Sequence, residues 1–137
     1  VLYLAHQRRF ADSYWSVVLP AIFIAYGATP LFPAQPPRKL AQNLLRSAPG
    51  LPPLRRLNLW VLDHAGIKVN TFPSAHVAGA VSAGLALTRL LPIAGICYMV
   101  VAIGIALATV RGRYHYCTDA VLGIAVAVVV FSSYLIF

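Results

Sequence analysis

Acidic residues are the scarcest feature of this sequence. Its 137 residues include three Asp and Glu residues against eleven Lys and Arg residues, which gives a formal net charge of +8. Charged residues make up 10% of the chain, whereas soluble domains average roughly 25%, and the mean hydropathy is +0.77. This composition excludes an ordinary soluble domain and predicts a membrane protein. With only Asp12, Asp63 and Asp119 as carboxylates, a magnesium site built from such side chains is not expected either.

Cysteine is also scarce, with two residues in the whole chain. Cys97 lies inside an apolar run and Cys117 inside a polar segment, and their spacing matches no metal or redox motif. We expect both to be buried as small apolar residues, and we expect no metal and no cofactor. The excess of basic residues favours anionic partners, which are either membrane lipid headgroups or an anionic substrate. A nucleic-acid partner is not expected.

Apolar runs, by contrast, fill most of the chain. Residues 14–32, 92–110 and 120–137 contain no charged residue, and residues 77–91 contain only Arg89. Helices of about 20 such residues can cross a hydrocarbon core of about 30 Å, and the last three runs are rich in the small residues that let membrane helices pack closely. The sequence therefore predicts an all-α transmembrane bundle of about four membrane-spanning helices. It forms a single domain over residues 1–137, with a fragment lacking N-terminal helices as the open alternative.

Residues 33–73 differ from the rest of the chain. They contain seven of the ten prolines and six of the eleven basic residues, which predicts a solvent-side connection with short interfacial helices at 39–47 and 54–65. Loops of this length are usually functional, so we expect this long basic, Pro-rich loop to carry part of an active site.

The turn "RLLP" places two of the apolar runs next to each other. Because so few residues connect 77–91 to 92–110, the two runs are predicted to form an antiparallel hairpin. The chain then returns to the membrane face that it left. His76, the segment 111–119 and the end of the basic loop at Pro73 are therefore expected to lie at the same face.

The segment "RGRYHYCTD", residues 111–119, carries the first candidate site. His115 and Asp119 are four residues apart, so they share a face if a helix starts here. A carboxylate that accepts a hydrogen bond from one imidazole nitrogen leaves the other nitrogen available as a nucleophile. Arg111 and Arg113 lie close by in the sequence, and guanidinium groups suit phosphate oxygens. The alternative interpretation is a set of polar residues that simply face the lipid headgroups.

The segment "FPSAH" carries the second candidate site. Pro73 can open a helix, and Ser74 with the unpaired backbone N–H groups of the first turn can bind an anion. His76 is then a proton donor beside that anion. The two segments together supply a phosphate site, a nucleophile with its orienting acid, and a general acid.

These two segments resemble the type 2 phosphatidic acid phosphatase (PAP2) superfamily. The family pattern contains K-x6-R-P, then P-S-G-H, then S-R-x5-H-x3-D, and "PSAH" and "RYHYCTD" are similar to the second and third parts. The resemblance implies that His115 is the nucleophile that forms a phosphohistidine, that Asp119 orients it, and that His76 protonates the leaving oxygen. It also implies that Ser74 and the Ala75 amide bind phosphate.

The sequence departs from the family pattern at several positions. Ala75 replaces a glycine, and Thr109 stands where the family has an arginine, so Arg111 or Arg113 has to take over that role. If the helix continued through this segment, Arg111 would share the face of His115; in a loop either arginine could serve.

The first part of the pattern is imperfect. Lys39 and Arg46 have the K-x6-R spacing, but Ser47 follows where the family has proline. Arg38, in "PPR", is an alternative phosphate ligand. The segment "PPR" ahead of "PSAH" also resembles the branch that contains inositol phosphorylceramide synthase-like phosphotransferases.

The expected function is that of an integral-membrane, metal-independent lipid phosphatase. A phosphotransferase on the same scaffold and a non-enzymatic membrane subunit are the alternatives. The expected partners are a lipid phosphate substrate and membrane lipids, and a homo-oligomer stays open. Basic residues usually face the cytoplasm, but the resemblance implies an active site on the periplasmic side of a bacterial inner membrane.

Overall fold

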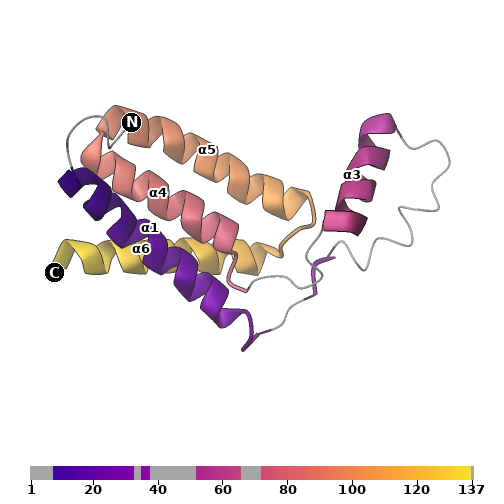
Figure 1. Ribbon diagram of the computed structural model, residues 1–137, viewed down its shortest axis with the longest axis horizontal. Coiled ribbons are helices and arrows are strands. Elements are labelled where there is room, and N and C mark those ends of the chain that lie inside the picture. Colours follow the sequence, from indigo (N-terminus) through magenta and orange to yellow (C-terminus); the bar gives the residue numbers. More distant parts are fainter. Residues whose placement is uncertain (1–7, 33–34, 38–51, 66–71, 137) are drawn as a thin grey trace.

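The computed structural model describes residues 8–32, 35–37, 52–65 and 72–136, and these residues form a helical bundle with one separate helix (Figure 1). The bundle contains α1 (Arg8–Ala28), α4 (Ala75–Leu90), α5 (Pro92–Arg111) and α6 (Cys117–Ile136), and the separate helix is α3 (Pro53–Ala65). No strand occurs in the described part of the chain. The all-α prediction is confirmed.

Three helices are long and apolar enough to cross a membrane. They cover Phe10–Ala28 in α1, Pro92–Arg111 in α5 and Cys117–Ile136 in α6. The predicted count of about four spans is not confirmed, because α4 has 16 residues and is about 24 Å long at 1.5 Å per residue. The sequence run that suggested a fourth span is instead the central helix of the bundle.

The central helix α4 packs against α1, α5 and α6, and nine of its residues are buried. Its buried residues are small: five Ala and one each of Ser and Gly accompany two Val residues. In contrast, α5 has two buried residues, Gly95 and Ala102. Because small side chains let helix axes approach, the Ala-rich helix lies at the centre while the larger side chains of α5 face outward.

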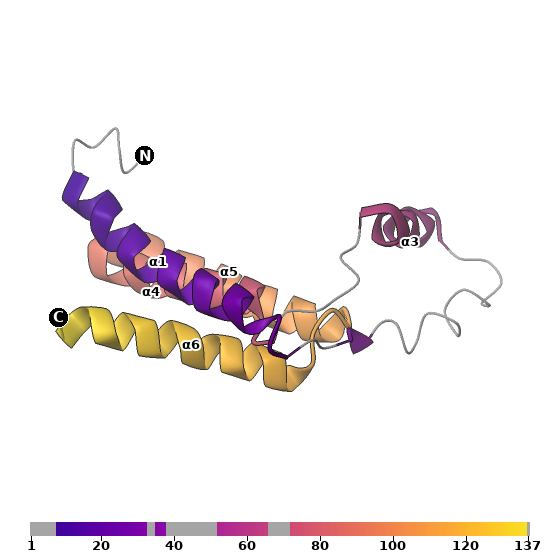
Figure 2. The same ribbon diagram turned by 60° about the horizontal axis from the view of Figure 1, so that its bottom comes forward.

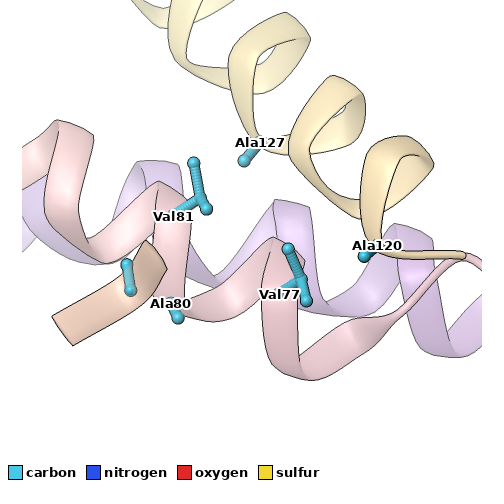
Figure 3. Close-up of a cluster of buried hydrophobic side chains, with 6 residues drawn as sticks. Val77, Ala80, Val81, Ala120 and Ala127 are labelled. Carbon is cyan, nitrogen blue, oxygen red and sulfur yellow. The ribbon is translucent and has the colours of Figure 1, made fainter. Parts of the chain in front are cut away.

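The core between α4 and α6 is made of valine and alanine side chains (Figure 3). Val77 and Val81 of α4 point toward Ala120 and Ala127 of α6. A second cluster of buried residues joins Val17 and Ala21 of α1 to Ala86 of α4 and Val130 of α6. Pro20 lies inside α1, as membrane helices tolerate when neighbours compensate for the lost hydrogen bond.

The connection between α4 and α5 is as tight as the sequence predicts. Leu91 alone separates the two helices, and Pro92 occupies the first turn of α5, where its missing N–H costs nothing. A Cβ atom at Gly95 would lie 2.2 Å from the backbone nitrogen of Thr88, so this position requires glycine. The two helices form the predicted antiparallel hairpin, and the start of α4 and the end of α5 lie at the same end of the bundle (Figure 1).

The basic loop is described only over 52–65 and at a few neighbouring residues. The helix predicted at 54–65 is present as α3, which contacts none of the four other described helices and stands beyond the end of the bundle at which α4 begins (Figure 2). Its Leu54, Leu57 and Trp60 are exposed, which suits a helix that lies in the membrane interface. The helix predicted at 39–47 lies outside the described residues.

Both cysteines differ from their prediction. Cys97 on α5 and Cys117 at the start of α6 are exposed free thiols rather than buried residues. The reason is that α5 and the first turn of α6 lie at the periphery of the bundle. The apolar neighbours of Cys97 in the sequence did not indicate this position.

Candidate active site

The site begins with the contact between His115 and Asp119. Nδ1 of His115 lies 3.3 Å from Oδ2 of Asp119, and the two residues are 4% and 1% exposed. In the tautomer that donates from Nδ1, the other ring nitrogen keeps its lone pair for a different partner. His115 lies in the loop, two residues before α6 starts at Cys117. The predicted pairing is therefore present, although only Asp119 is helical.

Asp119 is held by its own helix start. Its Oδ2 accepts a hydrogen bond from the backbone N–H of Tyr116 at 3.0 Å, and its Oδ1 accepts one from the hydroxyl of Thr118 at 3.4 Å. The carboxylate reaches back to the residue that precedes the helix, as the third residue of a capping box does, and it lies at the end where a helix dipole favours negative charge. These contacts fix the carboxylate that faces His115.

The loop 112–116 fixes the backbone of His115. The carbonyl of Thr109 accepts hydrogen bonds from the N–H groups of Tyr114 at 2.9 Å and His115 at 3.1 Å. Helix α5 ends at Arg111, so the loop alternative is correct and the helix alternative is wrong. Among the described residues Arg113 is the non-glycine residue with a positive φ, 58°, whereas Gly112 has φ −73°.

The second half of the site is the start of α4. Ser74 is the N-cap, and its side chain accepts a hydrogen bond from the N–H of Val77 at 3.4 Å. Pro73 follows a cis peptide bond and precedes the cap, so the helix opens at Ala75, two residues after the predicted Pro73. Ala75 is the first helical residue and has no positive φ, so its methyl group introduces no backbone strain where the resembling family has glycine.

A backbone hydrogen bond joins the two halves. The N–H of Ser74 donates to the carbonyl of Asp119 at 3.0 Å, and Ser74 is fully buried. As a result, the rings of His76 and His115 lie together, with centroids 5.9 Å apart and an angle of 59° between their planes. His76 is exposed. Two imidazoles that are separated by nearly forty residues in the chain thus meet at one end of the bundle, as the hairpin predicts.

The basic residues of the site are described in part. Arg111 ends α5 and Arg113 lies in the loop before His115, and both are exposed. Thr109, at the position where the resembling family has arginine, donates its hydroxyl hydrogen bond to the carbonyl of Ala106 at 2.8 Å and supplies no positive charge. Lys39, Arg46 and Arg38 lie outside the described residues.

Two features of the site were missed in the sequence. The backbone N–H of Tyr116 and the hydroxyl of Thr118 hold Asp119, and the spacing from Tyr116 to Asp119 could have indicated the first contact as a capping-box pattern. Gly123 packs against the start of α4, which no local pattern indicates. Over residues 8–32, 35–37, 52–65 and 72–136, no cluster of three His, Cys, Asp or Glu residues with the geometry of a metal site is found.

Comparison with protein families agrees with this geometry. A model of the PAP2 superfamily matches residues 1–133, which is nearly the whole chain, so the chain belongs to the PAP2 superfamily, a family of phosphatase type. Together with the three apolar helices, this makes it an integral membrane protein. No curated protein and no solved structure matches the chain significantly.

Proposed function

We propose, from membership of the PAP2 superfamily, that this protein is a metal-independent lipid phosphatase. It would hydrolyse a phosphate monoester or diphosphate of a lipid through a phosphohistidine intermediate. The observation that carries the proposal is the arrangement of the two imidazoles: His115 is buried against Asp119 at 3.3 Å, and the exposed ring of His76 lies 5.9 Å from it.

In the first step Nε2 of His115 attacks phosphorus, and the bond between phosphorus and the lipid oxygen breaks. His76 donates a proton to that oxygen, so the lipid leaves as a neutral alcohol. Asp119 accepts the Nδ1–H of His115 and stabilises the positive charge that the ring acquires.

In the second step water attacks the phosphohistidine. His76 accepts a proton from the water, the bond between phosphorus and nitrogen breaks, and His115 returns to its neutral form with release of phosphate. The same residue acts first as an acid and then as a base: the proton that it gives to the alcohol is replaced by the proton that it takes from the attacking water, so its ring has to be accessible to water. The exposure of His76 supports this role.

Positive charge replaces a metal ion in this proposal. Arg111 and Arg113 flank the loop of His115, and guanidinium groups neutralise the equatorial oxygens of a transferring phosphoryl group. Lys39, Arg46 and Arg38 are proposed as further phosphate ligands from the sequence pattern, together with the Ser74 and Ala75 positions at the N-terminus of α4. Of the chain's three carboxylates, Asp119 contacts His115 through a hydrogen bond. Asp12 lies near the start of α1, at the end of the bundle away from the site.

The direct test is phosphate release by the purified protein from phosphatidic acid, phosphatidylglycerol phosphate and a polyprenyl diphosphate. We expect release from at least one of these lipids, loss of at least about 10⁴-fold in His115→Ala, and full activity in EDTA. Phosphate release by His115→Ala at the wild-type rate would contradict the proposal. Inhibition by EDTA that magnesium reverses would show that the reaction depends on a metal ion.

The phosphotransferase is retained as a second candidate because "PPR" at 36–38 resembles that branch. Adding an alcohol acceptor to the same assay distinguishes the two, since a transferase forms a new phosphoester at the expense of free phosphate. We also propose that the site faces the periplasm of a bacterial inner membrane. Labelling of a cysteine introduced at Lys68 from each side of the membrane tests this, and labelling from the cytoplasm would contradict it.

A further inference from the structure

The contact between α6 and the start of α4 depends on the absence of a side chain at Gly123. Gly123 is buried on α6, one helical turn after Asp119. A Cβ atom there would lie 2.7 Å from the carbonyl oxygen of Ser74, and 3.2 Å from both the nitrogen of Ala78 and the Cβ of Val77. Ordinary contacts begin at 3.4 Å, so Ser74 would have to retreat by about 0.7 Å. The nearest atom is backbone, which no side-chain rotation can move away.

Ser74 is held by α6 at two points. Its N–H donates to the carbonyl of Asp119 at 3.0 Å, and its carbonyl lies against Gly123 one turn later on α6. The same carbonyl accepts the N–H of Ala78 at 2.9 Å, so Ser74 moves with the first turn of α4. His76 belongs to that turn, and a displacement of Ser74 away from α6 therefore displaces His76.

The side chains of His115 and Asp119 are joined to each other within the loop and α6. The carboxylate of Asp119 contacts His115, Tyr116 and Thr118, which lie in the loop or the first turn of α6. A side chain at position 123 would meet Ser74 and the first turn of α4 directly, and would thus move the proposed general acid relative to the nucleophile.

We infer that Gly123 is a positioning residue that sets the distance between His76 and His115. The inference rests on the proposed function, because it assumes that His76 protonates the leaving group. A misplacement of about 1 Å can cost on the order of 10²-fold in rate. The loss should be concentrated in proton delivery to the leaving oxygen, and esters that need this proton least should be affected least.

The experiment compares Gly123→Ala on two esters that differ in their leaving groups. Phosphatidic acid releases an alkoxide that requires protonation, whereas p-nitrophenyl phosphate releases a stable phenolate. We expect kcat/KM, which reports the steps up to formation of the phosphohistidine and not its hydrolysis, to fall about 100-fold on phosphatidic acid and less than about 10-fold on p-nitrophenyl phosphate. His76→Ala is the reference, and it should show a loss that depends on the ester in the same direction.

Gly104→Ala is the matched control. Gly104 also lies in a membrane-spanning helix, α5, and a Cβ atom there would meet nothing within 4 Å. We expect this variant to have wild-type kcat/KM on both esters and a wild-type melting temperature. This control measures how a Gly-to-Ala change in a membrane helix affects activity and stability when the junction of α4 and α6 is left unchanged.

The outcomes separate this inference from the proposed function. Equal losses on the two esters, or no loss, in Gly123→Ala would overturn the positioning role. A Gly123→Ala protein that does not fold, as judged by its melting curve in detergent, would also overturn it by showing that Gly123 is required for assembly alone. Failure of the proposed function would appear elsewhere, as wild-type protein that cleaves neither ester or as activity in His115→Ala.

Discussion

The starts of α6 and α4 meet in one site but differ in how they hold their histidines. At α6, His115 and Asp119 are 4% and 1% exposed, and the carboxylate accepts hydrogen bonds from the backbone and from a hydroxyl. At α4, the buried residue is the cap Ser74, while His76 is exposed. The proposed nucleophile is therefore fixed by the protein, and the proposed general acid is open to its surroundings.

This difference matches what each proposed role requires. A nucleophile has to keep one tautomer and one orientation through both chemical steps, which burial against a fixed carboxylate provides. A general acid has to change its protonation state twice in each turnover, which access to water permits. Substitutions that act on one side at a time can break or sharpen this comparison.

The largest effect is expected on the buried side, in Asp119→Asn. The amide oxygen can still accept the N–H of Tyr116, so the fold should persist, but the negative charge that stabilises His115 is lost. We expect kcat on phosphatidic acid to fall about 10³- to 10⁴-fold with unchanged expression. Asp12→Asn, at an exposed position of α1, is the matched control and should retain full activity. A near-normal rate for Asp119→Asn would mean that the buried pair is structural.

A smaller effect is expected on the open side, in Arg111→Gln and Arg113→Gln. Both arginines are exposed and carry positive charge close to His115 in the sequence. At least one of the two substitutions should raise KM for a lipid phosphate about 10-fold, because it removes a charged hydrogen bond to phosphate. Arg89→Gln, in the last turn of α4 at the opposite end of the bundle, should leave KM unchanged. If neither loop arginine affects KM, the phosphate is held by other groups and the open side plays no part in binding charge.

The smallest effect is expected in Ser74→Ala. The hydroxyl caps α4 by accepting the N–H of Val77, and removal of such a cap costs about 1 kcal/mol of stability. Ser133→Ala is the control, because its exposed hydroxyl only donates to a carbonyl of its own helix. Melting temperatures in detergent measure both variants. Equal melting temperatures would show that α6, rather than its own cap, holds the start of α4.

Local spacing predicted the geometry of this site well. The four-residue interval from His115 to Asp119 and the short turn after Leu90 were sufficient to place both histidines at one end of the bundle, because each depends on a few neighbouring residues. The environment of each helix was not predictable in this way. Hydropathy describes α4 and α5 alike as apolar, but a membrane protein can direct an apolar face to lipid or to another helix, and only packing distinguishes them.

The same limit explains the other differences. Gly123 looks like any other small residue of a membrane helix until the carbonyl of Ser74 is placed against it. Cys97 sits among apolar residues but on the outward side of α5. The positive φ of the loop falls on Arg113 rather than on its neighbour Gly112, next to the hydrogen bonds from Tyr114 and His115 to the carbonyl of Thr109.

The short length of α4 sets its first turn back from the end of α5. Its 16 residues return through a single connecting residue into the 20 of α5, so its first turn lies about 6 Å below the level at which α5 ends. A lipid that approaches from the bilayer would therefore meet guanidinium groups at the height of its phosphate and an imidazole at the height of the oxygen that joins the phosphate to its tail. In the proposed function, the step between these two neighbouring helices would orient the scissile bond, with the phosphoryl group toward water and the alcohol toward the hydrocarbon.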